Sequence, residues 1–293
     1  MDKSTFVEGE RAGSHGESPI ERPDQADGGI RHVTSTIERT PDTVAEVRPD
    51  GRRLEVFRTW VPEVPVALEF NGVAYAVMMA TPADLEDFAT GFAVGEGLAA
   101  KAAQVVDIGV AEAEAGWIVR TQIDGLGAER LAERVRTRVA ESSCGLCGIE
   151  NLEAFTRPLP LVVPHSAIDG AAIFRALGAL RGEQPLGQTT GAAHAAAHAA
   201  PDGSLLCVRE DVGRHNALDK LVGARLRAAE SLAPGFVLST ARCSYEIVEK
   251  AVKAGATTLV TVSLPTGMAV DRARAAGLSL WALARQDSVL QVV

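Results

Sequence analysis

The chain has 293 residues, 46% of them hydrophobic and 23% charged, a composition typical of an ordinary globular protein with one large or two modest domains. Its formal net charge of −9 argues against a nucleic-acid-binding protein, because the surfaces of such proteins are normally basic. No window has the apolar length of a membrane span and the first residues lack the apolar core of a signal peptide, so we expect a cytoplasmic protein with no membrane partner.

The first part of the chain predicts no stable structure. Residues 1–48 are rich in Gly, Ser, Glu, Asp, Arg and Pro and contain few apolar side chains. A segment of this composition cannot bury enough apolar surface to offset its ordering entropy. We therefore expect a disordered leader, with order beginning near Arg53.

Residues 49–140 predict a small β-rich subdomain. The runs 64–70 and 73–79 flank an Asn71-Gly72 pair, which is typical of a β-hairpin. Thr81 precedes a proline and is the expected N-cap of a helix that follows this hairpin. Two further strands and a basic amphipathic helix complete the subdomain.

Residues 141–293 alternate between helical and strand patterns, which predicts a largely parallel sheet covered by helices. Ligands of such sheets gather at the carboxyl ends of the strands, where residues 239–242 and 263–267 lie. We expect helices at 166–180, 214–229, 244–254 and 267–276, and strands at 191–200, 205–209, 236–240, 258–263 and 278–284.

Cys144 and Cys147 form a Cys-x-x-Cys pair between glycines. A zinc site needs two more ligands, yet Cys207 and Cys243 are isolated, and Cys207 lies in an apolar strand where we expect a buried thiol. A thioredoxin-like motif would follow a strand and precede a long helix, whereas here a helix comes before the pair. We therefore expect a loop that presents a nucleophilic thiolate.

A second polar block runs from Arg209 to Lys220 and is too rich in functional side chains for an ordinary surface helix. Arg214, His215 and Asn216 follow the bend at Gly213 and occupy the predicted first turn of a helix. That turn exposes unpaired backbone N–H groups, so it favours an anion site.

His194 and His198 have the spacing of a metal-binding pair on a helix. The segment predicts a strand instead, in which the two rings lie too far apart to share an ion. We expect a structural or exposed role for His198, whereas His194 could face a site.

The two blocks together identify a resemblance to the formate dehydrogenase accessory sulfurtransferases, the FdhD family. It is carried by Ser-Ser-Cys-Gly-Leu-Cys-Gly at 142–148 and by Arg-Glu-Asp-Val-Gly-Arg-His-Asn-Ala-Leu-Asp-Lys at 209–220. Weaker similarities at 81–97, 190–194 and 241–269 extend it over roughly residues 53 to 285.

The resemblance implies a sulfur carrier that accepts sulfane sulfur from a cysteine desulfurase. The acceptor is the molybdenum bis(molybdopterin guanine dinucleotide) cofactor, a bound substrate that afterwards enters formate dehydrogenase. The resemblance also implies a homodimer and a cytidine-deaminase-like α/β/α core in the second half, with the smaller β-rich part before it. Because the deaminase zinc signature is missing from the sequence, we expect no protein-ligated metal.

On this basis Cys144 is the expected persulfide carrier and Cys147 its partner. The cofactor is expected to lie against Arg214, His215 and Asn216 at the helix start, against Arg242, and against the tail. The tail residues are Leu283, Ala284, Arg285, Gln286, Asp287 and Ser288. We expect Arg242, at the end of a sheet strand, to be better shielded than Arg285. The alternatives are a chaperone that binds the cofactor without moving sulfur and a zinc-dependent hydrolase.

Overall fold

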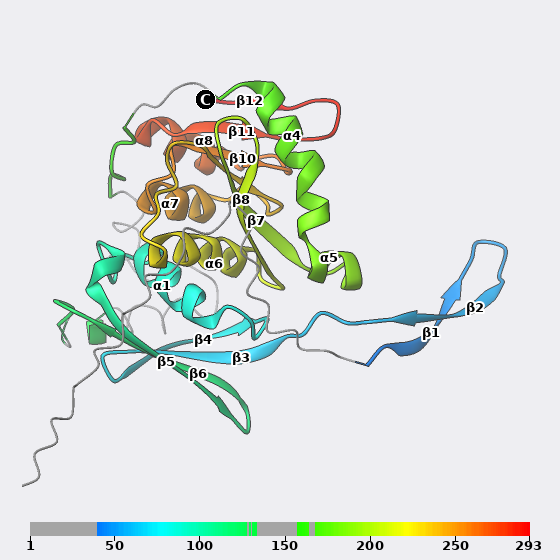
Figure 1. Ribbon diagram of the computed structural model, residues 1–293, viewed down its shortest axis with the longest axis horizontal. Helices are drawn as coiled ribbons and strands as arrows, with labels where there is room; N and C mark the ends of the chain where they lie inside the picture. The colour runs from blue at the N-terminus through cyan, green and yellow to red at the C-terminus, as the bar shows by residue number, and fades with distance from the viewer. Residues whose placement is uncertain (1–39, 128, 130, 134–156, 164–167) are drawn as a thin grey trace, which may run out of the picture.

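The computed structural model describes residues 40–127, 129, 131–133, 157–163 and 168–293 (Figure 1). The predicted boundary between residues 140 and 141 lies outside this part of the chain. No helix in the described ranges is long and apolar enough to cross a membrane.

A two-stranded hairpin stands away from the rest of the molecule (Figure 1). β1 (Asp42–Val47) pairs antiparallel with β2 (Arg53–Arg58), and the indole Nε1 of Trp60 donates to Asp42 Oδ2 at 2.6 Å. β1 lies inside the predicted disordered leader, so the limit at residue 48 is wrong. Composition alone misjudged this segment, because its ordering depends on cross-strand pairing with β2.

A four-stranded sheet forms the β-rich N-terminal part and has the order β4-β3-β6-β5. Its strands are β3 (Val64–Phe70), β4 (Val73–Ala80), β5 (Val105–Ala113) and β6 (Gly116–Ile123), with η1 (Ala102–Gln104) before β5. The predicted hairpin is confirmed: Asn71 and Gly72 have φ angles of 47° and 79°, the left-handed values that such a two-residue turn needs. α1 (Leu85–Gly95) covers one face of this sheet.

Thr81 does not cap α1, so that prediction is wrong. The residue before the helix is Asp84, which has a φ of 52° and makes no side-chain cap. The Thr81 hydroxyl instead donates to Pro62 O and accepts from Val212 N at 3.1 Å. A contact with a residue 131 positions away thus replaces the local one.

A six-stranded sheet forms the core of the second part, in the order β12-β11-β10-β9-β7-β8. Its strands are β7 (His194–Ala199), β8 (Leu205–Asp211), β9 (Phe236–Ser239), β10 (Thr258–Thr261), β11 (Ser279–Ala282) and β12 (Leu290–Gln291). β9, β10 and β11 are parallel, whereas β7 runs antiparallel to both β9 and β8. The carboxyl ends of β8 to β11 and the start of β7 therefore lie along one edge of the sheet.

Helices cover both faces of this sheet, giving the predicted three-layer α/β/α arrangement. α6 (Arg214–Arg227), α7 (Tyr245–Lys253) and α8 (Gly267–Ala276) pack on one face and α4 (Gly170–Leu180) on the other. Two short helices, η2 (Arg181–Glu183) and α5 (Pro185–Thr190), lead from α4 to β7. The fold class is confirmed as α/β with a smaller β-rich part before the core.

α1 and α6 join the two parts by crossing at two glycines. A Cβ at Gly91 would lie 1.8 Å from the carbonyl oxygen of Asp219, and one at Gly223 would lie 1.8 Å from that of Asp87. Only glycine permits this approach of the two backbones. Beside the crossing, the Asp87 carboxylate accepts from Arg209 Nε at 3.0 Å and from Arg227 Nη1 at 2.6 Å.

Candidate functional site at the carboxyl edge of the large sheet

The loops that follow β9, β10 and β11 lie side by side. The residue Cys243 forms a parallel bridge with Pro265, and Thr266 N donates to Cys243 O at 3.0 Å. Leu283 N in turn donates to Ser263 O at 3.2 Å. Three segments that the sequence analysis singles out are thus neighbours at this edge: the Arg242 loop, residues 263–267 and the tail.

The start of α6 lies at the same edge and presents free backbone donors. Gly213 is the N-cap residue and has no side chain that could cap the helix. The first hydrogen bond of the helix runs from Ala217 N to Gly213 O. Among the described residues, the N–H groups of Arg214 and His215 have no acceptor. Since α6 has 14 residues, its dipole adds positive potential here.

The side chain of Arg214 also contains a hydrogen-bond donor that lacks an acceptor in the described structure. Its Nε is buried and has no hydrogen-bond partner within the described part of the chain. A buried donor without a partner is costly, so a bound anion would satisfy this group. The orphan guanidinium N–H and the open helix start together fit a phosphate.

His215 lies beside an acidic partner from the neighbouring helix. Its Nε2 is 3.0 Å from Oε2 of Glu246, in the first turn of α7. The close contact with His215 lowers the pKa of the Glu246 carboxyl more than burial raises it, and the charge of Arg214 contributes in the same direction. Glu246 thus holds His215 next to Arg214 and stays ionised.

Asn216 points away from the open side of the bend. Its Nδ2 donates to Met79 O and to Asp211 Oδ1, both at 2.9 Å. Asp211 is fully buried and also lies 2.6 Å from Lys220 Nζ and accepts from Thr81 N at 3.0 Å. Asn216 therefore contributes to the fold, fastening the bend to the end of β4, rather than to ligand contact.

Most of the polar block from 209 to 220 serves the structure in the same way. The carboxylate of Glu210 accepts from Leu186 N and Gly187 N at the start of α5. Asp219 binds Lys250 Nζ at 2.8 Å, and both side chains are buried. Of the block, Arg214 and His215 remain as side chains that face the edge.

The two other arginines that were predicted to bind the cofactor, Arg242 and Arg285, are both exposed, so Arg242 is not shielded from solvent. Arg285 donates to the carbonyl of Val262, and its backbone N–H closes a turn onto Ser288 O at 2.8 Å. In the tail, Ala284 is 2% exposed and turns inward. Gln286, Asp287 and Ser288 are exposed on the turn. The shielded arginine of the edge is Arg214.

Cys144 and Cys147 lie outside the described residues. Of the other cysteines, Cys207 is buried as predicted, and burial raises the pKa of its thiol. Burial also raises the pKa of Cys243 to about 11. Neither is a thiolate at neutral pH. The described ranges contain no group of three or more His, Cys, Asp or Glu side chains that could hold a metal ion.

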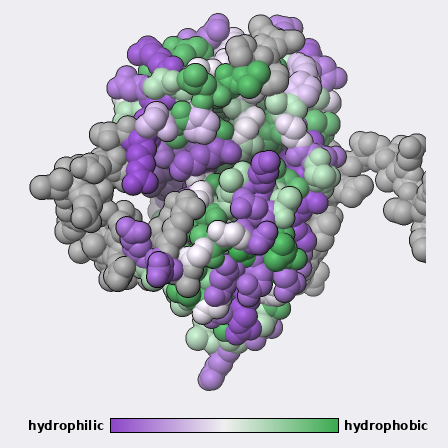
Figure 2. All heavy atoms as spheres, turned by 90° about the vertical axis from the view of Figure 1, so that its left-hand side faces the viewer, coloured by the Kyte–Doolittle hydropathy of each residue, from purple (hydrophilic) through white to green (hydrophobic). Residues whose placement is uncertain are grey.

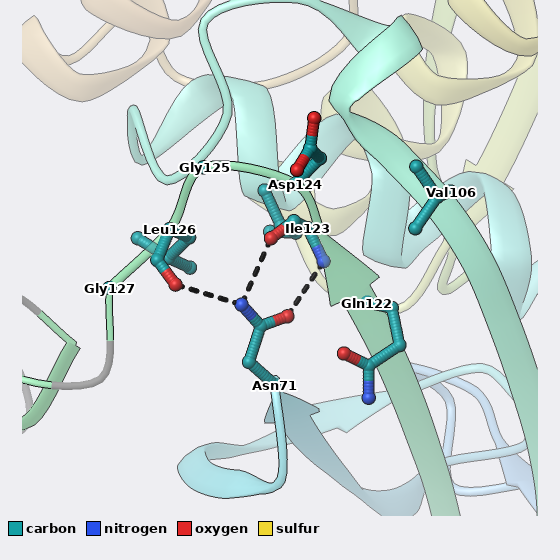
Figure 3. A pocket seen from close by; sticks show the side chains of 8 residues that line it. All are labelled: Asn71, Val106, Gln122, Ile123, Asp124, Gly125, Leu126 and Gly127. Carbon is teal, nitrogen blue, oxygen red and sulfur yellow. Dashed lines mark hydrogen bonds between the residues drawn. The ribbon is translucent and has the colours of Figure 1, made fainter.

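A pocket elsewhere on the molecule contains none of the predicted site residues (Figure 3). It lies beside the end of β6, where the Asn71 amide is bonded to the backbone of Ile123 and Leu126. Its lining consists of Asn71, Val106, Gln122, Ile123, Asp124, Gly125, Leu126 and Gly127. The amide of Asn71 is therefore already satisfied by the backbone. On the side of the molecule in Figure 2, hydrophilic and hydrophobic side chains are intermixed.

A family model described as FdhD/NarQ family matches residues 61–292. The chain belongs to this family. Among its relatives is the sulfur carrier protein FdhD of Variovorax paradoxus (strain S110), 44% identical over 242 residues, which are 82% of this chain and 87% of that protein. The sulfur carrier protein FdhD of Bordetella petrii is 43% identical over 223 residues, 76% of this chain and 80% of the relative.

A solved structure supports the fold of this FdhD/NarQ family member. The crystal structure of a protein assigned as a formate dehydrogenase accessory protein, from Desulfotalea psychrophila, has a TM-score of 0.66 to this chain at 24% identity. It covers 85% of this chain and 94% of its own.

One acidic residue at the carboxyl edge of the large sheet could not be identified from the sequence. Nothing in the pattern indicates that Glu246 is the partner of His215, because the two lie on different helices and 31 positions apart. Only the packing of α7 beside α6 makes them neighbours.

Proposed function

We propose that this chain carries sulfur as a persulfide on Cys144, between a cysteine desulfurase and the molybdenum bis(molybdopterin guanine dinucleotide) cofactor of formate dehydrogenase. The observation that carries the proposal is the 44% identity, over 82% of the chain, to a relative named sulfur carrier protein. The Cys144–Cys147 pair supplies the thiols that such a role requires.

The chemistry needs two thiol steps. The Cys144 thiolate attacks the terminal sulfur of the desulfurase persulfide and displaces the desulfurase thiolate, so that Cys144 becomes the persulfide. The Cys147 thiolate then attacks Sγ of Cys144, forming a disulfide and releasing the terminal sulfur as sulfide to the molybdenum. Two electrons pass from the thiols to the sulfur, and a cellular thiol reductant restores the pair.

The carboxyl edge of the large sheet supports binding of the nucleotide part of this substrate. Arg214 offers a buried N–H that has no acceptor among residues 40–127 and the other described ranges, and the start of α6 offers backbone N–H groups; both suit a diphosphate. Arg242 and Arg285 add positive charge around them.

Mass spectrometry of the intact protein, after incubation with a cysteine desulfurase and cysteine, tests the sulfur step. We expect a mass increase of one sulfur atom that is lost on treatment with a thiol reductant and is missing in Cys144→Ala. The matched control is Cys243→Ala, which removes a buried thiol and should leave the persulfide in place. An unchanged persulfide in Cys144→Ala would contradict the assignment.

Formate dehydrogenase activity in cells separates the carrier from a chaperone. A carrier requires Cys144, so cells that contain only Cys144→Ala should lack active enzyme. A chaperone that only binds the cofactor would support full activity with the same variant. The partners of the proposed carrier are the desulfurase, formate dehydrogenase and a second copy of the chain, whose presence light scattering would report.

A further inference from the structure

His194 occupies a central place at the edge described above. It is the first residue of β7, its Cα pairs with that of Asp211 at the end of β8, and its side chain is partly exposed. On the other side of β7, the backbone of the next residue is bonded to Thr240, just after β9: Thr240 N donates to Ala195 O at 3.0 Å. The imidazole thus lies between the start of α6 and the loop that carries Arg242.

The Thr240 hydroxyl lies against Nδ1 of His194. The Thr240 hydroxyl donates to Ala195 O at 3.3 Å and accepts from Ala195 N at 2.8 Å. Its oxygen also lies 3.3 Å from Nδ1 of His194. One tautomer satisfies all of these contacts: the hydroxyl donates to Ala195 O, Nδ1 donates to the hydroxyl oxygen, and Nε2 has the free lone pair.

The surroundings keep this ring neutral. Burial is the largest cause that lowers the pKa of His194 below 6.5, and the charges of Arg214 on α6 and Arg242 after β9 act in the same direction. The Asp211 carboxylate and the contact with Thr240 oppose them. The edge therefore combines arginine side chains and backbone N–H groups, which are donors, with one imidazole nitrogen that accepts.

We propose that His194 Nε2 accepts a hydrogen bond from an N–H or O–H group of the ligand and so selects a nucleoside phosphate over inorganic pyrophosphate. The inference rests on the proposed function, since it assigns a residue of the same nucleotide site. At neutral pH pyrophosphate keeps a P–OH group and can satisfy the arginines and the helix start, but it has no sugar or base that could place a donor beside the phosphates. A ribose hydroxyl or the N1–H and amino group of guanine can supply one beside the phosphates.

Calorimetric titration of GDP and of pyrophosphate into the full chain tests the proposal. The variant is His194→Asn, whose side-chain amide can still donate to Thr240 but has no atom at the position of Nε2. We expect GDP affinity to fall by about fivefold, the usual effect of losing one hydrogen bond, and pyrophosphate affinity to stay within about twofold. His194→Gln, which can place an acceptor near Nε2, should recover part of the GDP affinity.

The pH dependence of ligand affinity distinguishes a direct contact of His194 with the ligand from a purely structural role. Lowering the pH through the pKa of His194, which burial holds below 6.5, converts Nε2 from an acceptor into a cationic donor. The ratio of wild-type to His194→Asn affinity should therefore fall for GDP and rise for pyrophosphate, and taking the ratio cancels the protonation of the ligands themselves.

Two outcomes would overturn the proposal in different ways. An equal loss for both ligands, or a GDP ratio that rises on acidification, contradicts the acceptor role of His194 and leaves the nucleotide site intact. A wild-type chain that binds pyrophosphate but not GDP contradicts both this inference and the proposed nucleotide site.

Discussion

The two sides of the bend between β8 and α6 use similar residues for opposite purposes. On the inner side, the Asp211 carboxylate accepts from Gly213 N at 2.6 Å and Asn216 Nδ2 at 2.9 Å and lies 2.6 Å from Lys220 Nζ. On the outer side, Arg214 has a buried N–H with no partner among the described residues. The two sides differ in hydrogen bonding rather than in composition: the Asp211 carboxylate has several donors, whereas Arg214 Nε has no acceptor in the described part of the chain.

The two histidines of β7 differ in burial. His198 is 1% exposed, and burial lowers its pKa to about 4. His194, four residues earlier, is partly exposed at the edge, with Nδ1 3.3 Å from the Thr240 hydroxyl. Density of polar residues along a sequence therefore does not separate a buried polar group from one that lies at the edge.

Among the substitutions considered, Lys220→Met on the inner side of the bend should cause the largest loss of unfolding free energy. The substitution leaves Asp211 buried without its counter-charge, which typically costs about 3–5 kcal/mol of unfolding free energy. Urea denaturation measures the loss. Lys253→Met is the matched control, because Lys253 pairs with Glu249 near the surface at 3.6 Å and should cost less than about 1 kcal/mol. Equal losses in the two variants would refute the contrast between the inner network and the surface.

Gly223→Ala tests the support beneath the bend. The new methyl group would lie 1.8 Å from Asp87 O, so α1 and α6 must separate, and we expect a loss of about 3 kcal/mol. Gly178→Ala is the control: it lies on an exposed face of α4, and its methyl group would contact nothing within 4 Å. There the unfolding free energy should rise by about 0.5–1 kcal/mol. A neutral Gly223→Ala would mean that the helices do not cross as described.

The pH dependence of stability sharpens the comparison of the two histidines. The folded-state pKa of His198 is about 4 and its ordinary value is 6.5, so the unfolded chain takes up the proton first as the pH falls. Its contribution is complete above pH 6.5 and is lost between pH 6.5 and pH 4. Between pH 7 and pH 4 the wild type should lose roughly 2–3 kcal/mol more than His198→Leu. Parallel curves for the two proteins would exclude His198 as the cause.

Substitutions on the outer side of the bend should change ligand affinity rather than stability. Arg214→Ala removes the shielded donor and should weaken GDP binding by about 1–3 kcal/mol with little change in melting temperature. Arg285→Ala should have a smaller effect, below about 1 kcal/mol, because an exposed charge is screened by solvent. Calorimetry on the two variants measures the difference. A larger loss in Arg285→Ala would move the main anchor of the ligand to the tail.

Several features could be predicted from the sequence because they depend on local patterns. The Asn71-Gly72 turn needs positive φ angles, and Asn and Gly adopt them most easily. The predicted helix at 267–276 has the observed bounds of α8, since Thr266 caps its start and Gly277 ends it in the left-handed conformation. Alternating strands and helices likewise predicted the edge where the loops meet.

The features that sequence could not predict depend on contacts between distant residues. Thr81 has the local signature of a helix cap, yet the bond to Val212 decides its role. Within the block from 209 to 220, only the approach of β4 determines that Asn216 turns inward and Arg214 does not. The roles assigned to Cys144 and Cys147 stay predictions, because both lie outside the described residues.

The projecting β1–β2 hairpin has a consequence for how the protein is handled. The family model's match begins at residue 61, just after β2 ends at Arg58, so the hairpin precedes the residues that this model covers. A lone two-stranded ribbon is marginally stable in water, and its amide protons should exchange with solvent long before the rest of the molecule unfolds. Because Arg48, Arg52, Arg53 and Arg58 are all exposed there, brief trypsin treatment should cut this ribbon before it cuts the two sheets that follow.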